Sequence, residues 1–165
     1  MISRKKRQGN ALEALRELHK SCRSTCITTS CRRGRCILIL PSVRTLCIDC
    51  DKCSCFKPGA SKPDFIVLYA GSQRSSSYWY IVEMKRPTDH PRHITTQLQA
   101  GARAIDSCPS FRLSTSVPLL LPVVLHQGGI HADDCDTLRK RRILFHGERI
   151  GIKIQRCGTK LDRLA

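Results

Sequence analysis

The chain has 165 residues, with 29 Lys and Arg against 13 Asp and Glu, a formal net charge of +16 and a pI near 9.8. This length is sufficient for one domain with a single core and excludes a second full domain of ordinary size. The strong positive charge favours a polyanionic partner, most simply nucleic acid, although charge alone does not identify an enzyme.

Apolar stretches are too short for a membrane span, which needs roughly 20 residues. The run over 117–125 is interrupted by two prolines, and the basic residues near the start lead into polar sequence rather than into a signal peptide. We therefore expect a soluble intracellular protein, in the cytoplasm or nucleoid, with no membrane partner. In a reducing compartment the 11 cysteines are expected to bind metal or stay free rather than form disulfides.

In chain order, residues 1–8 read as a flexible basic arm, and residues 9–165 as one domain. Apolar residues recur at helical spacing over 10–20, which predicts an amphipathic helix that Asn10 can cap. Residues from about 21 to 57 are rich in Cys, Arg, Ser and Thr and read as an insertion that holds at most one strand, over 36–40.

The second half of the chain alternates between strand and helix patterns. Runs over 65–70 and 78–86 predict a hairpin, helical spacing returns over 93–105, and 119–126 reads as a buried strand. Residues 141–157 read as two strands around a turn at His146-Gly147. This order predicts an α/β domain with a mixed β-sheet flanked by helices, with α+β as the alternative class.

Three charged residues stand at the ends of the central pair of strands. Because side chains alternate along a strand, Glu83 and Lys85 share one face, and Asp64 comes alongside if the two strands pair. Mg²⁺ is commonly held by one or two protein carboxylates together with several waters. A lysine beside the ion can stabilise charge on a phosphate, so the three residues constitute a minimal phosphodiesterase site.

Pro63-Asp64 followed by Glu83-Met84-Lys85 resembles the signature of the PD-(D/E)xK nuclease superfamily, and the likeness covers roughly residues 9–126. The resemblance implies a restriction-endonuclease-like core and a Mg²⁺- or Mn²⁺-dependent endodeoxyribonuclease. It implies that Asp64, Glu83 and the carbonyl of Met84 bind the ion, while Lys85 positions the attacking water.

The same resemblance implies two further site residues. The Gly9-Asn-Ala-Leu-Glu13 stretch is similar to the entry of Holliday-junction-resolvase-type members, in which a helix glutamate supports the metal, and Glu17 is the alternative. Several branches also carry a glutamine on the helix after the lysine. Gln97 fits this role, with Gln99 as the alternative.

Closely spaced cysteines indicate a second metal. Zinc prefers four Cys or His ligands in a tetrahedral array, and the favoured set is Cys47, Cys50, Cys53 and Cys55. A cysteine from the group Cys22, Cys26, Cys31 and Cys36 is an alternative ligand. An iron–sulfur cluster fits less well, because its known pattern in this superfamily takes most ligands from after the catalytic core. The His- and Asp-containing segment over 126–135 reads as a solvated turn rather than a further metal site.

Two basic clusters are candidate phosphate contacts: Arg4, Lys5, Lys6 and Arg7, and Arg139, Lys140, Arg141 and Arg142. The sequence thus predicts a metal-dependent DNA endonuclease of restriction, resolvase or repair type. A homodimer is expected, since one small active site cuts one strand. The alternative is a non-catalytic, basic, zinc-binding protein that binds nucleic acid.

Overall fold

The computed structural model describes the backbone of residues 4–41, 43–71, 77–114 and 118–164, and the side chains of these residues from Ala11 onward. Among them, six strands form one mixed sheet in the order β1-β4-β5-β6-β7-β10. Neighbours from β1 to β6 pair antiparallel, whereas β6, β7 and β10 pair parallel. Their bounds are Ile27–Thr28, Thr45–Asp49, Phe65–Ala70, Ser77–Lys85, Leu119–His126 and Lys153–Arg156 for β1, β4, β5, β6, β7 and β10.

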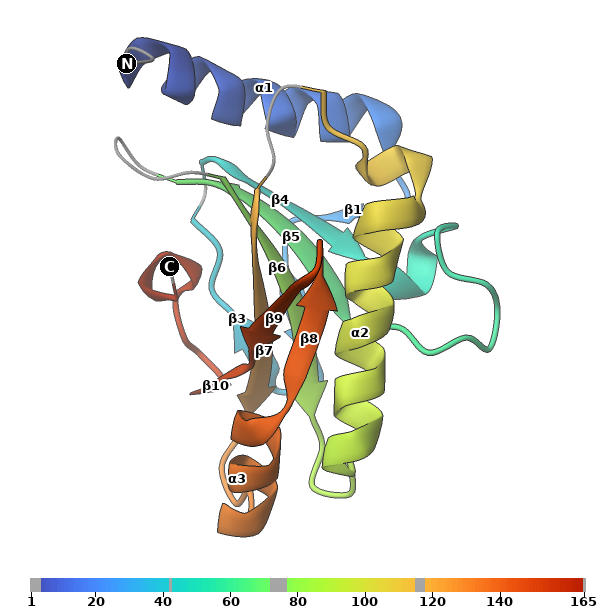
Figure 1. The fold of residues 1–165 in the computed structure, drawn as a ribbon, viewed down its shortest axis with the longest axis vertical. Helices are drawn as coiled ribbons and strands as arrows, with labels where there is room; N and C mark the ends of the chain where they lie inside the picture. Colours follow the sequence, from blue (N-terminus) through green and yellow to red (C-terminus); the bar gives the residue numbers. More distant parts are fainter. Residues whose placement is uncertain (1–3, 42, 72–76, 115–117, 165) are drawn as a thin grey trace.

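One face of this sheet is covered by helices. Figure 1 shows α2 (Pro91–Ser107) running along the sheet while α1 (Arg4–Ser21) crosses one end of it. Apolar residues of both helices, including Leu18, Ile94 and Leu98, pack against Ile66 and Ile81 of the central strands. The α2 stripe follows the helical spacing in the sequence, so burial of that stripe explains why this segment is a helix.

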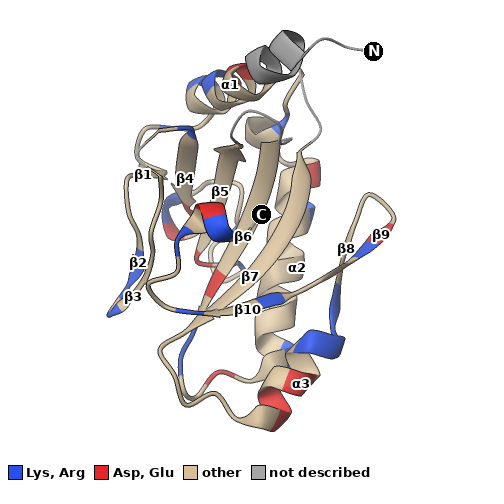
Figure 2. Cartoon of the chain, turned by 90° about the vertical axis from the view of Figure 1, so that its left-hand side faces the viewer, with Lys and Arg blue, Asp and Glu red and all other residues tan. Residues whose placement is uncertain are grey.

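The opposite face is covered by the β2–β3 hairpin (Cys31–Arg33 and Cys36–Leu38) and by the C-terminal 3₁₀ turn η3 (Leu161–Arg163). Leu38 and Leu161 pack there against Phe65 and Tyr80. Figure 2 shows this hairpin and α2 on opposite sides of the sheet. The central strands β5 and β6 are therefore buried on both faces, which accounts for their almost continuous apolar sequence.

Two predictions for the first third of the chain are wrong. The segment 21–57 is not an insertion with a single strand, because it contains β1 to β4 and the short 3₁₀ helix η1 (Cys50–Lys52), and β4 lies inside the main sheet. Likewise, α1 begins at Arg4, so residues 4–8 continue the helix instead of forming an arm.

The second half agrees with the predicted order and adds one helix. The predicted helix over 93–105 lies within α2, and residues 141–157 contain the hairpin β8–β9 (Arg142–Phe145 and Glu148–Gly151) together with β10. Ala132–Lys140 is the helix α3 rather than part of a solvated turn, and its Leu138 is fully buried. None of the helices in the described ranges is long and apolar enough to cross a membrane.

Three disulfides join distant parts of the chain: Cys31–Cys47, Cys36–Cys157 and Cys55–Cys108. The prediction of unpaired cysteines is wrong for these six residues. Five cysteines remain reduced, of which Cys22, Cys26, Cys50 and Cys53 are buried and Cys135 is partly exposed.

Candidate functional site

Asp64 and Glu83 lie opposite each other at the ends of two paired strands. Phe65 pairs with Val82 in the antiparallel register of β5 and β6, which places Asp64 across from Glu83. The backbone N–H of Asp64 donates to Glu83 Oε2 at 3.1 Å, and the N–H of Met84 donates to Asp64 Oδ2 at 2.8 Å. The sequence-based prediction that these two carboxylates come together is confirmed.

Burial makes this pair of acids difficult to ionise together. Burial, and then the negative charge of Asp64, raises the pKa of Glu83 to about 9, against the hydrogen bonds that it accepts. Burial also raises the pKa of Asp64, although the Met84 N–H and the nearby Arg33 oppose the shift. In the absence of a cation, Glu83 therefore holds a proton at neutral pH, and a cation between the acids would favour its release.

Gln97 lies over Glu83 from helix α2. Its side chain hydrogen-bonds Glu83, while its Oε1 atom is buried and has no hydrogen-bond partner among the described residues. Gln99, the alternative, instead bonds the backbone of Leu144 in both directions at 2.9 Å. The structure therefore brings Gln97 to the carboxylates and places Gln99 elsewhere.

Lys85 is on the same strand face but is turned toward the β6–α2 connection. Its Nζ donates to the carbonyl of Asp89 at 2.8 Å and to that of Arg86 at 3.3 Å, and it lies 3.7 Å from Asp134 Oδ2 at the start of α3. The structure describes no hydrogen bond or ion pair from this ammonium to Asp64 or Glu83. The structure therefore brings the two acids together as predicted, whereas the ammonium of Lys85 contacts Arg86, Asp89 and Asp134 instead.

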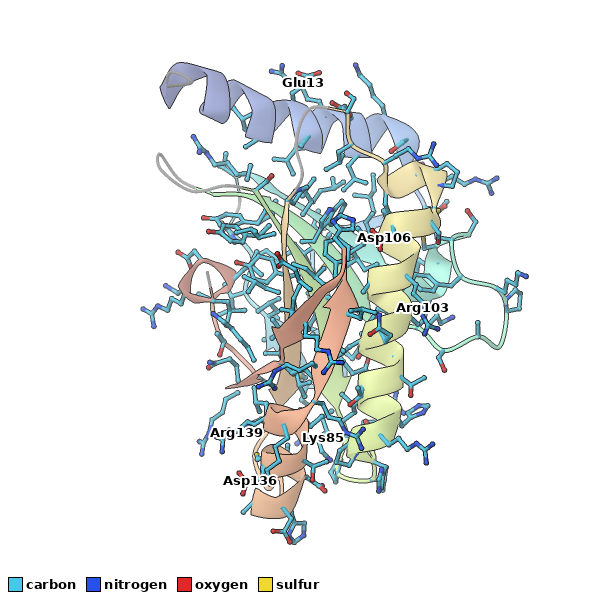
Figure 3. The ribbon with its side chains drawn as sticks, viewed as in Figure 1. Glu13, Lys85, Arg103, Asp106, Asp136 and Arg139 are labelled. Atoms are coloured by element: carbon cyan, nitrogen blue, oxygen red, sulfur yellow. A yellow bond between two sulfur atoms is a disulfide. The ribbon has the colours of Figure 1, made fainter. Side chains whose placement is uncertain are left out.

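The predicted helix glutamate is not part of this site. Glu13 is on the exposed side of α1, where it pairs with Arg16 at 3.4 Å, and Figure 3 shows it at the opposite end of the molecule from Lys85. The alternative, Glu17, accepts from the N–H and hydroxyl of Ser114 at 2.7 and 2.9 Å. Both glutamates belong to the α1 end of the fold, so neither prediction for a supporting glutamate is correct.

Three charged residues that the sequence pattern did not indicate lie beside Asp64. Arg33, on the β2–β3 hairpin, donates from Nε to Asp64 Oδ1 at 3.2 Å and from Nη2 to Asp49 Oδ1 at 2.7 Å. The same nitrogen lies 3.1 Å from Asp51 Oδ2. Burial alone would raise the pKa of Asp49, but the hydrogen bond and charge of Arg33 outweigh it and lower that pKa. The sequence offered one indication of Asp49, because this acid ends the largely apolar run that begins at Thr45. The structure shows this run as strand β4.

These residues surround a pocket of about 420 Å³. Its lining includes Arg33, Asp51, Asp64, Glu83, His93 and Gln97. Within the described part of the chain, no group of three or more His, Cys, Asp or Glu side chains is arranged to hold a metal. Two facing carboxylates and an unpartnered amide oxygen nevertheless fit the oxygen ligands that Mg²⁺ takes, because this ion keeps several waters. Met84 contributes its N–H to Asp64, and a role for its carbonyl stays a prediction.

The predicted zinc ligands do not form one set. Cys47 is bonded to Cys31 and Cys55 to Cys108, so neither sulfur is free as a thiolate ligand. Cys50 and Cys53 are reduced and buried, and burial raises the pKa of both thiols. The prediction of zinc on Cys47, Cys50, Cys53 and Cys55 together is therefore wrong.

One predicted basic cluster can be placed on the fold. Arg139, Lys140, Arg141 and Arg142 are all exposed at the end of α3 and the start of β8. Figure 3 shows Arg139 and Lys85 toward the same end of the molecule. The side chains of Arg4, Lys5, Lys6 and Arg7 lie outside the described part of the chain.

Comparison of the chain with protein-family models, curated proteins and solved structures yields no match.

Proposed function

We propose that the protein is a Mg²⁺- or Mn²⁺-dependent endonuclease with a restriction-endonuclease-like core, and that its substrate is DNA. One observation carries the proposal: Asp64 and Glu83 face each other at the edge of a pocket and are linked by a 3.1 Å hydrogen bond. Ionising both buried acids together is unfavourable, as the pKa of about 9 for Glu83 indicates, and a cation bound between them would favour the ionised pair.

The roles of the chain follow from where its groups lie. Asp64 and Glu83 would hold the ion, and Gln97 would orient Glu83 while offering its free Oε1 to the pocket. The bound ion would supply a water of lowered pKa and neutralise charge on the scissile phosphate. Asp64 keeps its orientation through the Met84 N–H, so the pair is already positioned before any ion enters.

Lys85, at the end of strand β6, would act on the phosphate. Its three ammonium donors now meet the carbonyls of Asp89 and Arg86 and the carboxylate of Asp134. A long lysine side chain can turn from carbonyls toward a phosphate oxygen, where the attraction between full charges is stronger. The basic residues of α3 and β8 would then hold the DNA backbone without reading its sequence. A homodimer that cuts both strands and an intracellular location remain part of the proposal.

The test is cleavage of supercoiled plasmid with Mg²⁺ or Mn²⁺ by the wild type, Asp64→Ala and Lys85→Ala. We expect both substitutions to lower the cleavage rate by about 100-fold or more, the usual effect of losing one group that stabilises the transition state. The matched controls are Asp136→Ala and Lys57→Ala, which change exposed residues outside the pocket. Nicking of branched, linear and single-stranded DNA would then identify the substrate form.

Cleavage that survives both substitutions would show that the catalytic assignment is wrong. It would leave a non-catalytic nucleic-acid-binding protein, which is the second function that the charge allows. The structure does not favour the zinc-dependent form of that function, since two of its four expected ligands are in disulfides.

A further inference from the structure

Arg33 lies against Asp64 and lines the pocket that a metal ion would enter. Its Nε donates to Asp64 Oδ1 at 3.2 Å and its Nη2 to the carbonyl of the same residue at 3.3 Å. The other carboxylate oxygen, Oδ2, already accepts from the Met84 N–H. Both oxygens of Asp64 therefore have donors, and one of these donors carries a full positive charge.

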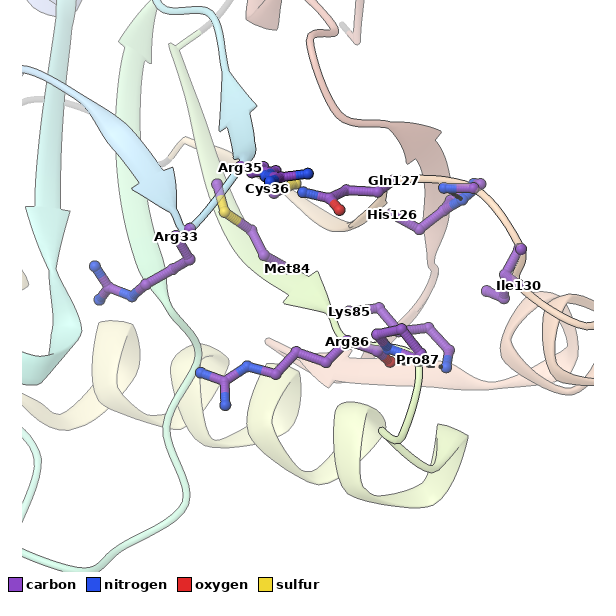
Figure 4. A pocket seen from close by; sticks show the side chains of 13 residues that line it. Arg33, Arg35, Cys36, Met84, Lys85, Arg86, Pro87, His126, Gln127 and Ile130 are labelled. Atoms are coloured by element: carbon purple, nitrogen blue, oxygen red, sulfur yellow. Dashed lines mark hydrogen bonds between the residues drawn. The ribbon is translucent and has the colours of Figure 1, made fainter.

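The same guanidinium is held by more than Asp64. It also binds Asp49 and Asp51 at 2.7 and 3.1 Å, and it stacks over the ring of Phe65 at 4.3 Å from the centroid. Figure 4 shows Arg33 extending from the β2–β3 hairpin, with Met84 and Lys85 at the end of strand β6. Arg33 is therefore a cation shared by three acids, and its hold on Asp64 depends on the hairpin that carries it.

Two disulfides fix the hairpin that carries Arg33. Cys31 on β2 is bonded to Cys47 on strand β4 of the main sheet, and Cys36 on β3 is bonded to Cys157 just after β10. Arg33 and Cys36 are partners in the register of the hairpin, so the two covalent anchors stand on either side of its turn. Non-covalent support on that side includes backbone hydrogen bonds from Gly158 to Ile37 at 2.7 Å, from Leu161 to Ile39 at 2.9 Å and from Ile39 to Thr159 at 3.0 Å, together with the packing of Leu38 against the sheet.

We propose that Arg33 is a tethered counter-ion that competes with a divalent cation for Asp64, and that the Cys31–Cys47 and Cys36–Cys157 disulfides maintain this competition. With both disulfides closed, the guanidinium stays on Asp64 and metal binds weakly. Reduction removes both covalent anchors of the hairpin, which lets Arg33 move away from Asp64 and lets the carboxylates bind the ion more tightly. Each reduction takes two electrons and two protons from one dithiol, which becomes a disulfide while the protein S–S bond becomes two thiols.

This inference rests on the proposed metal site, so the test measures metal binding directly. Mn²⁺ is titrated into the full chain, and the free ion is measured by its electron paramagnetic resonance signal. The samples are the oxidised wild type, the wild type reduced by dithiothreitol and then desalted without oxygen, and oxidised Arg33→Gln. We expect the Kd for Mn²⁺ to fall about tenfold on reduction and in Arg33→Gln, the usual size of an effect from a neighbour of a metal ligand.

Three controls isolate the mechanism. Arg35→Gln removes an exposed positive charge from the same turn and should leave the Kd unchanged. Cys55→Ser with Cys108→Ser removes the disulfide outside the hairpin and should bind Mn²⁺ like the oxidised wild type. Asp64→Asn in the Arg33→Gln background should abolish the tighter binding. Circular dichroism melting checks that each variant folds, and the reduced wild type serves as a second test if Arg33→Gln does not.

The results separate this inference from the proposed function. If Arg33→Gln and the reduced wild type bind Mn²⁺ no more tightly than the oxidised wild type, the competition is refuted, even if plasmid cleavage still depends on Lys85. If both bind more tightly and plasmid stays intact, the competition stands and the nuclease assignment fails. Tighter binding in Arg35→Gln as well would show only a general charge effect and would also refute a specific role for Arg33.

Discussion

At the scale of single residues, the titration of Glu83 links the site to the stability of the fold. Its pKa is about 9 in the folded chain, against 4.5 for an unperturbed glutamate. At a pH between these two pKa values, the folded state therefore holds a proton that the unfolded state has lost. The contribution to stability is fully present below about pH 4.5 and is lost as the pH rises through 9.

Glu83→Gln mimics the protonated acid and should remove this dependence. We expect the variant to melt at a higher temperature than the wild type at pH 8 to 9, with a difference that shrinks toward pH 4.5. Melting followed by circular dichroism across this range measures the effect. Glu148→Gln, on the exposed part of β9, is the control. A difference between Glu83→Gln and wild type that does not change with pH would contradict the argument.

The residue pattern predicted part of the site and could not predict the rest. The meeting of Asp64 and Glu83 follows from alternation along two strands joined as a hairpin, which is local in sequence. Arg33 lies 31 positions before Asp64 and reaches it only because a separate hairpin folds over the far face of the sheet. Such a contact depends on tertiary packing and on disulfide pairing, which spacing alone does not specify.

At the scale of elements, the distance between α2 and the sheet depends on Gly101. A Cβ atom at this position would lie 2.7 Å from Ile81 Cγ2 and 2.9 Å from Pro63 Cγ. Gly101 is one helical turn after Gln97 and on the same side of the helix, so this close approach also keeps Gln97 over Glu83.

Gly101→Ala should therefore be destabilising, although alanine is the better helix former. We expect a loss of about 1–3 kcal/mol in the free energy of unfolding, the usual cost of overpacking a tight contact. Urea denaturation measures it. Gly151→Ala is the control, since its added Cβ would meet nothing within 4 Å. Equal stability of the two variants would mean that α2 can shift away without cost.

Elements with strong periodicity were predictable and those with mixed composition were not. The stripe of α2 and the apolar runs of β5 and β6 appear directly in the sequence. Strand β4 was missed because cysteines flank and interrupt its apolar residues, so that the segment resembled a metal-binding loop. Helix α3 was missed because its ADDCD start is polar and only Leu138 is buried.

At the scale of the whole molecule, the net charge of +16 should dominate any affinity for nucleic acid. Because each bound phosphate releases counterions, the affinity should fall steeply with salt. Lys140→Ala with Arg141→Ala should reduce the slope of log K against log salt by about 1 for each phosphate that these side chains bind. Fluorescence anisotropy with labelled duplex DNA measures this slope.

The control is a matched pair of exposed cations, Lys20→Ala with Arg23→Ala, at the end of α1. Figure 1 shows α1 and α3 toward opposite ends of the molecule. If both pairs reduce the slope equally, the DNA is bound by the overall field and not by the α3 end.

The Cys36–Cys157 bond joins positions 121 residues apart, so it encloses most of the chain in one loop. Even when the fold is lost, residues 36–157 of the oxidised chain stay closed in a ring. In the chain-entropy view, a ring of this size lowers the conformational entropy of the unfolded state. This raises the free energy of that state by about 5 kcal/mol. A single cut in the backbone between Cys36 and Cys157 would release no fragment, because this bond would keep the two pieces joined. Where the cut falls within 31–47 or 55–108, a second disulfide would join them as well.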